Sequence, residues 1–343
     1  MNEMFMYRLG QKRGGNSGGG EEWIGDGNTH IWITLHEGRT SPMLGVGVKG
    51  TVTVDWGDGS APDTLKGTSI STLKRTAAHE YGKAGDYVIT LSGGEIGILG
   101  DRYYSSFLLA AITAYTNTKN NVYLNAVKKF ECGTNLTEIS LGAFYYCHSL
   151  ESINISNSAT SISNYAFSNC YSLASISIPD GVTSIGDSAF SSCSSLANVS
   201  IPDGVTSIGN YSFQSCYSLA SINIPDGVTS IGDKAFYQCY SLASISIPDG
   251  VTSIGDSAFR YCHSLASINI SDSVTSIGDQ AFGYCYGAFC FDFTKHTAVP
   301  TLTGTNAFQG IPDDCQIRVP VALVDEWKAA TNWSTYADKI VGV

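Results

Sequence analysis

Cysteines are the side chains of this 343-residue sequence with the most obvious chemistry, and seven of the ten recur at a spacing of 23 residues. Thiolates can bind zinc or form disulfides, but both uses need sulfur atoms that converge. If each 23-residue unit is one coil of a stack, the Cβ atoms of neighbouring cysteines lie in a line about 4.8 Å apart. That line is too straight for tetrahedral zinc and too wide for a disulfide. We therefore expect an inward column of reduced thiols that pack as small hydrophobic side chains, formed by Cys147, Cys170, Cys193, Cys216, Cys239, Cys262 and Cys285.

Three cysteines, Cys132, Cys290 and Cys315, lie outside this column. A disulfide from Cys290 to Cys285 or Cys315 is the alternative to three free thiols. The cysteine content does not decide between a reducing and an oxidising compartment, because secreted disulfide frameworks usually show other spacings.

Carboxylates form two further groups that could bind Ca²⁺ through oxygen ligands. A tight cluster near the start of the chain contains Asp55, Asp58 and Asp63. Each aspartate also suits a turn, where its side chain accepts hydrogen bonds from nearby backbone. We favour the turn interpretation for both groups and keep Ca²⁺ as the alternative. The second group is a column at turn positions of the repeat, made of Asp180, Asp203, Asp226, Asp249 and Asp272.

Histidines give little support to catalysis, which needs a nucleophile, a base and an orienting group in one pocket. His148 and His263 occupy a repeat position that is tyrosine in other units, so they are variants of a column. No partner is evident for His30, His36 or His296. Phosphate-loop and H-E-x-x-H motifs are absent from the sequence, and no G-x-S-x-G elbow stands between a predicted strand and a helix. We expect neither an enzyme nor a cofactor.

Charge is unevenly distributed along the chain. The formal net charge is −11, and residues 139–285 alone carry −8, with Lys234 and Arg260 as their two basic side chains. Such a segment is repelled by phosphate backbones and anionic lipid heads. No apolar run approaches the roughly 18 residues that span a bilayer. We expect neither nucleic-acid binding nor membrane insertion.

The unit that carries the cysteines predicts a solenoid, since 23 residues cannot bury an apolar face without stacking on neighbours. In one unit, Leu219, Ile222 and Ile224 predict a short strand with an apolar inner side. A Pro-Asp-Gly turn follows, and Val228 and Ile231 begin a second inward stretch. A short helical turn carrying Phe236 comes next, with an N-cap at Asn164, Asp187, Asn210, Asp233, Asp256 and Asp279.

The unit "LxSIxIPDGVTSIGDxAFxxC" resembles the BspA-like, or Treponema-type, leucine-rich repeat of bacterial surface proteins. The resemblance covers about residues 127–310 and implies a binding role, often adhesion to host matrix, cells or other bacteria, without catalysis. We assign the solenoid to residues 127–320. Val324 and Trp327, then Tyr336 and Ile340, lie at helical spacing, which predicts a helical C-terminal cap over 321–343.

The first third of the chain has a different pattern. Residues 1–28 contain "GGNSGGG" and predict a flexible arm without the apolar core of a signal peptide, so export would use another route or a leader has been removed. Residues 29–98 show short alternating runs typical of a β-sandwich. The motifs "VDWGDG" at 54–59 and "HEYGKAGDYVITL" at 79–91 resemble the PKD-like, immunoglobulin-type module, in which His79 has a packing or hydrogen-bonding role. Residues 99–126 are a connector.

Two outward rows are the candidate ligand-binding residues. The position after each repeat cysteine gives an aromatic stripe suited to protein or carbohydrate contact, with His148, Tyr171, Tyr217, Tyr240, His263 and Tyr286. Outward strand positions give a flat polar face with Asn154, Ser177, Asn223 and Asn269.

The fold class is thus mainly β with short helical turns: a sandwich, then a solenoid, then a cap. We expect an extracellular or cell-surface bacterial adhesion or protein-interaction protein that binds a protein or glycan, of the host matrix or a cell surface, through its solenoid. The alternative is a structural component of a prophage tail or other particle, docked through the N-terminal domain.

Overall fold

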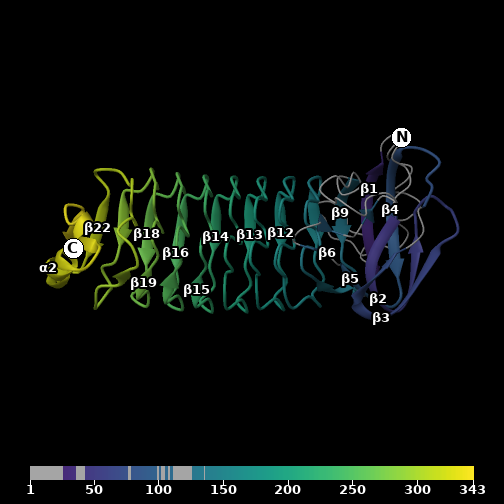
Figure 1. Cartoon of the computed structure of the whole chain (residues 1–343), viewed down its shortest axis with the longest axis horizontal. Coiled ribbons are helices and arrows are strands. Elements are labelled where there is room, and N and C mark those ends of the chain that lie inside the picture. The colour runs from purple at the N-terminus through teal and green to yellow at the C-terminus, as the bar shows by residue number, and fades with distance from the viewer. Residues whose placement is uncertain are drawn as a thin grey trace, which may run out of the picture.

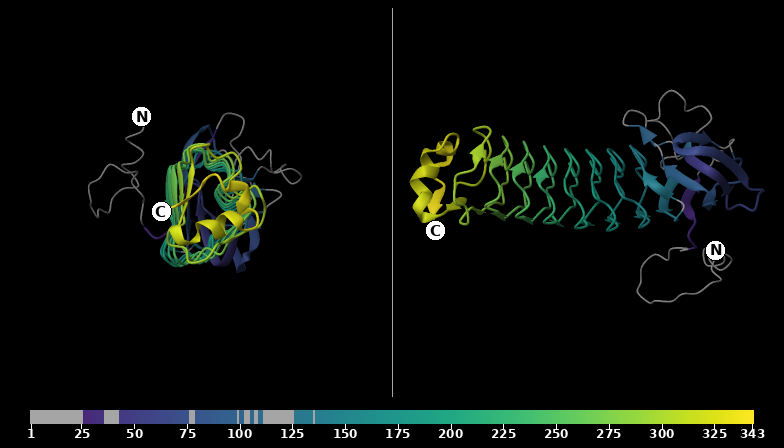
Figure 2. Two further views of the ribbon diagram at one scale, coloured as in Figure 1. Left: turned by 90° about the vertical axis from the view of Figure 1, so that its left-hand side faces the viewer. Right: turned by 90° about the horizontal axis from the view of Figure 1, so that it is seen from below.

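The computed structural model describes residues 26–35, 43–75, 79–98, 100–101, 105–106, 109–110, 126–134 and 136–343. This part of the chain is elongated, with a β region at the N-terminal end, a solenoid of about nine turns and a short helical cap (Figure 1). Seen along the long axis, the coils superpose (Figure 2). Most of the predicted arm and connector lies outside the described residues.

The N-terminal β region is organised around one long strand, β2. It forms a hairpin with β3, pairs with β4 through residues 53–55 and pairs with β5 through residues 47–49, always antiparallel. Its apolar residues Val46, Val48, Val52 and Val54 are fully buried, as alternation along a strand requires. The strands are β1 (Thr29–Leu35), β2 (Met43–Asp55), β3 (Asp63–Arg75), β4 (Gly85–Ser92), β5 (Glu95–Ile98), β6 (Gly100–Asp101), β7 (Ser105–Ser106) and β8 (Leu109–Ala110).

Both faces of the solenoid continue strands of this N-terminal region. On one face β1 pairs antiparallel with β4 and with β9 (Val127–Glu131), and β9 pairs in parallel with the first coil. On the other face β5 pairs in parallel with β10 (Leu136–Ile139), and Ile139 bridges to Ile162 of the next coil. The N-terminal edges of the solenoid are therefore covered by paired strands, which protects them from edge-to-edge association.

The solenoid has two parallel sheets, one on each long face. In the first sheet residues pair with those 23 positions later, as Ile176 does with Val199, except between β20 and β22, where the offset is 26, as from Cys290 to Gln316. Its strands are β11 (Ser152–Asn154), β12 (Ser175–Ser177), β13 (Asn198–Ser200), β14 (Ser221–Asn223), β16 (Ser244–Ile247), β18 (Ser267–Ile270), β20 (Cys290–Asp292), β22 (Gln316–Val319) and β23 (Ile340–Gly342). The second sheet contains β15 (Ser230–Ile231), β17 (Ser253–Ile254), β19 (Ser276–Ile277) and β21 (Thr301–Leu302).

Stacked phenylalanine rings form the centre of the solenoid core. From Phe144 to Phe282, successive rings in neighbouring coils lie 5.1 to 5.5 Å apart between centroids and within 9° of parallel. Leu219, Ile222 and Ile231 of one coil are at most 6% exposed. The predicted inward strands are confirmed.

The expected helical turn is wrong, because the segment after each Gly-Asp or Gly-Asn pair is a run of tight turns. Ala235 N donates to Gly232 O, and Cys239 N donates to Phe236 O. Lys234 and Gln238 have φ of 53° and 61°, a left-handed conformation that ends a right-handed helix. Equivalent residues in the other coils share it.

The C-terminal cap covers the last coil with buried aromatic side chains. Its elements are η3 (Val321–Leu323), α2 (Val324–Ala329) and η4 (Trp333–Tyr336). Trp327 and Trp333 are buried, with ring centroids 4.6 Å apart. The Tyr336 hydroxyl donates to Thr305 O at 2.7 Å and accepts a hydrogen bond from Phe308 N at 3.1 Å.

The predicted helical cap consists of three short helices that end at Tyr336 and does not extend to Ile340. Ile340 belongs to β23, which pairs in parallel with β22 through Ile317, so the helical spacing of Tyr336 and Ile340 was misleading. Val324 packs against the core from α2, as expected. The main sheet thus extends from the N-terminal region to the last described residues.

Candidate binding surfaces

A row of stacked aromatic rings follows the solenoid at the position after each repeat cysteine. We call it the aromatic row, and it consists of His148, Tyr171, Ser194, Tyr217, Tyr240, His263 and Tyr286. His148 stacks on Tyr171 with centroids 4.5 Å apart. Tyr240 lies between Tyr217, at 5.1 Å, and His263, at 4.8 Å. The row faces outward as expected, and it brings all the predicted aromatic residues onto one edge of the stack.

Packing within the aromatic row shifts the protonation of His148, the first residue of the row. Burial lowers the pKa of His148, so the neutral imidazole is favoured near pH 7. Burial also raises the pKa of the Tyr171 hydroxyl. These side chains therefore present uncharged rings, which suits stacking contacts.

A second group of aromatic side chains lies beside the row and was missed in the sequence. Tyr261 and Tyr284 stack with centroids 5.0 Å apart. The guanidinium of Arg260 lies 4.6 Å from the Tyr261 centroid and 5.2 Å from that of Tyr284, a cation–π arrangement. Both tyrosines directly precede a repeat cysteine, so the 23-residue period contained the signal.

The polar row on the first sheet lies in register, as its strand positions predict. Asn154 pairs with Ser177, and Ser246 pairs with Asn269. These side chains and Asn223 are exposed. The face lacks large aromatic side chains until Phe289, which is 57% exposed.

The Asn and Asp residues predicted as N-caps instead join neighbouring coils. Asp187 Oδ1 accepts a hydrogen bond from Asn210 N at 2.7 Å, and Asn210 Oδ1 accepts one from Asp233 N at 2.8 Å. The same bond recurs along the column from Asn164 to Asp279. The side chain thus caps the next coil, because the local segment is a turn with no helix to cap. A shallow groove of about 370 Å³ runs beside Asp233 and Asp256.

Aspartates of the Pro-Asp-Gly segments lie in tight turns. Val205 N donates to Pro202 O at 3.1 Å, and Val228 N donates to Pro225 O at 3.0 Å. Asp249 also accepts a hydrogen bond from Ser271 at 2.7 Å. Within the described ranges, no group of three or more His, Cys, Asp or Glu side chains is placed to hold a metal ion.

The repeat cysteines point inward, and all ten cysteines are buried and free. Each thiol from Cys170 to Cys285 donates a hydrogen bond to the phenylalanine carbonyl of the preceding coil, as Cys216 Sγ does to Phe190 O at 3.2 Å. Burial raises the pKa of the Cys193 thiol to about 12. The thiols therefore both fill space and satisfy a buried carbonyl, which the sequence did not indicate.

The repeat region is similar to a known family of repeat proteins. The model of the BspA type leucine-rich repeat region matches residues 116–243, 160–289 and 229–311, more than half of the chain. The chain belongs to this family. No curated protein matches.

Solved structures of bacterial leucine-rich repeat proteins are similar to this BspA-type chain. A leucine-rich repeat protein of T. pallidum is 26% identical, with 55% of this chain and 85% of that chain covered and a TM-score of 0.46. A leucine-rich repeat protein from Bacteroides ovatus is 22% identical, with 78% of this chain and 70% of that chain covered and a TM-score of 0.47. A leucine-rich cell surface protein of Faecalibacterium prausnitzii is 26% identical, with 67% and 79% covered and a TM-score of 0.37.

Outside the BspA-type repeats, the predicted residues of the N-terminal region come together around Trp56. His79 stacks on the Trp56 ring at 4.5 Å, and its Nε2 lies 2.8 Å from Asp58 Oδ2. The Tyr81 hydroxyl donates to Trp56 O, and Trp56 Nε1 donates to Asp63 Oδ2 at 3.0 Å. The expected packing and hydrogen-bonding role of His79 is confirmed.

The three carboxylates for which Ca²⁺ was the alternative each have a structural partner. Asp55 accepts a hydrogen bond from Gly57 N, and Asp58 accepts one from Ser60 N. Partial burial acts to raise the pKa of Asp58, but hydrogen bonds from Ser60 and His79 outweigh it and lower that pKa to about 2. This arrangement matches the turn interpretation.

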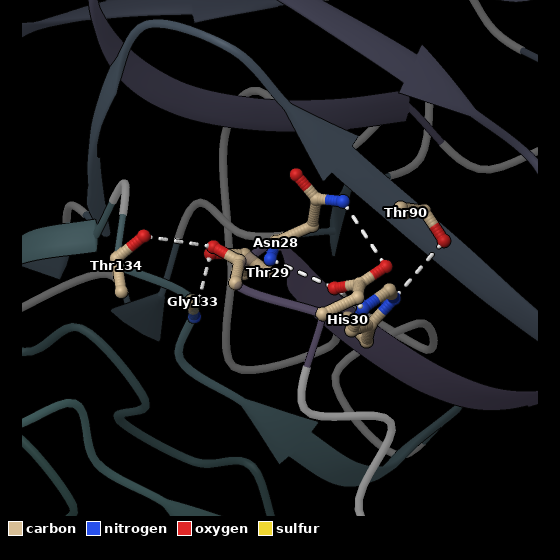
Figure 3. A network of polar contacts seen from close by, with 8 residues as sticks. Asn28, Thr29, His30, Thr90, Gly133 and Thr134 are labelled. Atoms are coloured by element: carbon tan, nitrogen blue, oxygen red, sulfur yellow. Dashed lines mark hydrogen bonds and ion pairs between the residues drawn. The ribbon is translucent and has the colours of Figure 1, made fainter. Parts of the chain in front are cut away.

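A polar network joins β1 and the residues before it to Gly133 and Thr134, which follow β9 at the start of the BspA-type solenoid (Figure 3). His30 lies 2.8 Å from Asp26 Oδ1 through Nε2 and 3.1 Å from Thr90 Oγ1 through Nδ1. Thr29 Oγ1 accepts a hydrogen bond from Gly133 N, and Gly133 lies so close to the Asn28 backbone that a Cβ would clash. His30 thus has partners that the sequence did not reveal.

His296 is buried beside Phe293 and Trp327, and His36 lies outside the described residues. No helix in the described part of the chain is both long and apolar enough to cross a bilayer.

Proposed function

We propose that this protein is a non-enzymatic cell-surface or extracellular protein that binds protein or glycan ligands through its solenoid, as an adhesin does. The aromatic row carries the proposal. The core needs only the inward Phe, Cys, Leu and Ile positions, yet Tyr171, Tyr217 and Tyr286 keep 41%, 42% and 56% of their surface exposed. Exposed tyrosines are favoured in binding surfaces because they offer large, rigid contact area.

Family membership supports the same proposal. Proteins with BspA-type repeats are typically surface proteins, and one similar structure carries that description. Repetition of the aromatic and polar rows would let one rigid solenoid make several weak contacts with a repetitive ligand, which raises avidity.

We assign residues 29–98 to a PKD-like domain that spaces or anchors the solenoid, 99–126 to a connector, 127–320 to the binding solenoid and 321–343 to its cap. The Trp56, His79 and Tyr81 cluster supports a locally ordered PKD-like motif in this N-terminal part. Pairing of β1 with β9 would hold that unit rigidly against the first coil.

Protease shaving of intact producing cells tests location, with an antibody that detects the chain. Surface exposure is the expected result, and a protected or particle-bound chain would contradict it. Binding is tested by removing 23-residue units one at a time and measuring attachment to immobilised matrix proteins and glycans. Attachment should weaken in steps, and full attachment after removal of most units would refute binding by the solenoid.

A further inference from the structure

The aromatic row is interrupted once, at Ser194. This serine is half-buried, and its hydroxyl donates to Tyr171 O at 3.3 Å, so it stays close to the coil surface. Tyr171 and Tyr217 lie one coil before and one coil after it. Each of them has one ring face covered by a neighbour, His148 or Tyr240, and the other face directed along the row towards the serine.

The exposed fractions of the tyrosine side chains reflect this gap in the aromatic row. Tyr240, stacked on both faces, is half-buried, whereas Tyr171 is 41% and Tyr217 is 42% exposed. The two rings are two coils apart, about 10 Å, because parallel strands are spaced about 4.8 Å apart. The gap, which we call the slot, therefore has the ring face of Tyr171 on one side, the ring face of Tyr217 on the other and Ser194 at its base.

The row itself shows what fits between two rings that are two coils apart. Tyr240 occupies this interval between Tyr217 and His263, with near-parallel planes at 6° and 13°. A flat aromatic ring placed over Ser194 would likewise lie between two rings, those of Tyr171 and Tyr217, that are two coils apart. Offset stacking on each side would add to the attraction that comes from burial of the ring surface.

Charge indicates which aromatic ligand is favoured. The segments 165–178, 188–201 and 211–224, which surround the slot, contain no charged residue, while residues 139–285 as a whole carry −8. A basic segment is attracted to this field and meets no cation at the slot that would repel it. An acidic segment, including a second copy of this chain with its net charge of −11, is repelled.

We propose that the slot between Tyr171 and Tyr217 binds an aromatic side chain from a basic segment of a partner protein, which inserts over Ser194 and completes the row. This inference rests on the proposed function and names the class of ligand that one site in the solenoid takes. Ring insertion, not a chemical reaction, is the recognition step.

The test is an NMR titration of the full chain against the peptide acetyl-Lys-Trp-Lys-amide, with acetyl-Lys-Leu-Lys-amide and methyl β-glucoside as comparison probes. A ring inserted between two tyrosine faces moves its own proton resonances upfield. Ser194→Tyr fills the slot, and Ser264→Tyr adds the same side chain at an exposed position next to a complete part of the row. Tyr217→Ala removes the aromatic ring on one side of the slot.

We expect upfield shifts of the indole protons with the wild-type chain and binding at least tenfold weaker with Ser194→Tyr, Tyr217→Ala or the leucine peptide. Ser264→Tyr should bind within twofold of wild type. Ser194→Tyr should unfold at the same or a higher temperature, since its ring continues the stack. Tyr217→Ala gives an independent result if Ser194→Tyr fails to fold.

No indole shift with the wild-type chain, or equal binding by wild type and Ser194→Tyr, would overturn the slot. Equal affinity for the tryptophan and leucine peptides would mean that charge alone attracts the peptide, which overturns insertion of an aromatic ring. Tighter binding of methyl β-glucoside than of the tryptophan peptide would mean that the slot binds sugars, which also overturns the proposal. Surface exposure and stepwise loss of attachment are measured separately, so the proposed function can stand where the slot fails.

Discussion

Replacement of Gly209 by alanine should weaken the solenoid through contact between coils. A Cβ at Gly209 would lie 2.8 Å from the backbone N and from Oδ1 of Asp187, whereas ordinary contact begins at 3.4 Å, so the coils must separate by about 0.6 Å. That movement lengthens the hydrogen bonds from Gly209 N to Ile185 O and from Asn210 N to Asp187 Oδ1, now 3.2 and 2.7 Å.

The expected loss of unfolding free energy is about 2–4 kcal/mol. Each weakened hydrogen bond contributes about 0.5–1.5 kcal/mol, and overpacking costs about 1–3 kcal/mol. The lower entropy of the unfolded alanine chain offsets about 0.4–1 kcal/mol.

Gly204, five residues earlier in the same coil, provides the matched control. A Cβ there meets Val182 O at 3.4 Å and Asp180 O at 3.5 Å, and neither glycine has a left-handed φ. Gly204→Ala should therefore lie within about 1 kcal/mol of wild type. Urea unfolding followed by far-ultraviolet circular dichroism measures both variants. Equal stability of the two variants would refute the explanation by coil contact.

Three further results are expected. Thiol alkylation at pH 8, mapped by mass spectrometry, should leave Cys193 and the other column cysteines unlabelled until the chain unfolds, because burial raises the pKa of Cys193 to about 12. Rapid labelling of these cysteines in the folded protein would contradict the buried column. Asp58→Asn should lower the free energy of unfolding by about 1 kcal/mol at pH 6, after allowance for solvent screening. In urea unfolding, the difference from wild type should vanish as the pH falls from about 4 to 2. The reason is that the lowered pKa of Asp58 makes its charged form stabilise the fold only above that range. A pH-independent difference would show that the charged Asp58 carboxylate, with its hydrogen bonds from Ser60 and His79, is not responsible. Tyr336→Phe should lower unfolding free energy by about 1–2 kcal/mol in the same assay, through loss of the hydrogen bond to Thr305 and of the acceptor for a backbone N–H; wild-type stability would show that the hydroxyl is dispensable.

Residues at the same place in successive 23-residue units were predicted well. In a stack of equivalent coils, a residue type that recurs with the period must have the same surroundings each time. The inward Phe and Cys columns and the outward aromatic row follow from this, because Phe236 and Cys239 lie among their own equivalents. The candidate binding residues could be placed on a common edge for the same reason.

Backbone conformation inside the coil was predicted less well. Lys234 and Gln238 are ordinary residues for a helix, and nothing local requires their left-handed φ. They adopt it because the chain must turn sharply to bring Phe236 into the core and return to the next strand. The Asn210 side chain likewise looked like a local N-cap, but its acceptor oxygen meets a donor of the next coil.

The sequence by itself determined the coil length, the composition of the core and the rows on the surface, since all three depend on periodicity within 23 residues. Only the tertiary structure decided how the N-terminal region joins the solenoid, because Ile31 pairs with Phe130 almost a hundred residues away. It also decided that the tyrosines beside Ser194 each keep one ring face open, since the ring planes are set by stacking between coils, of Tyr171 on His148 and of Tyr217 on Tyr240.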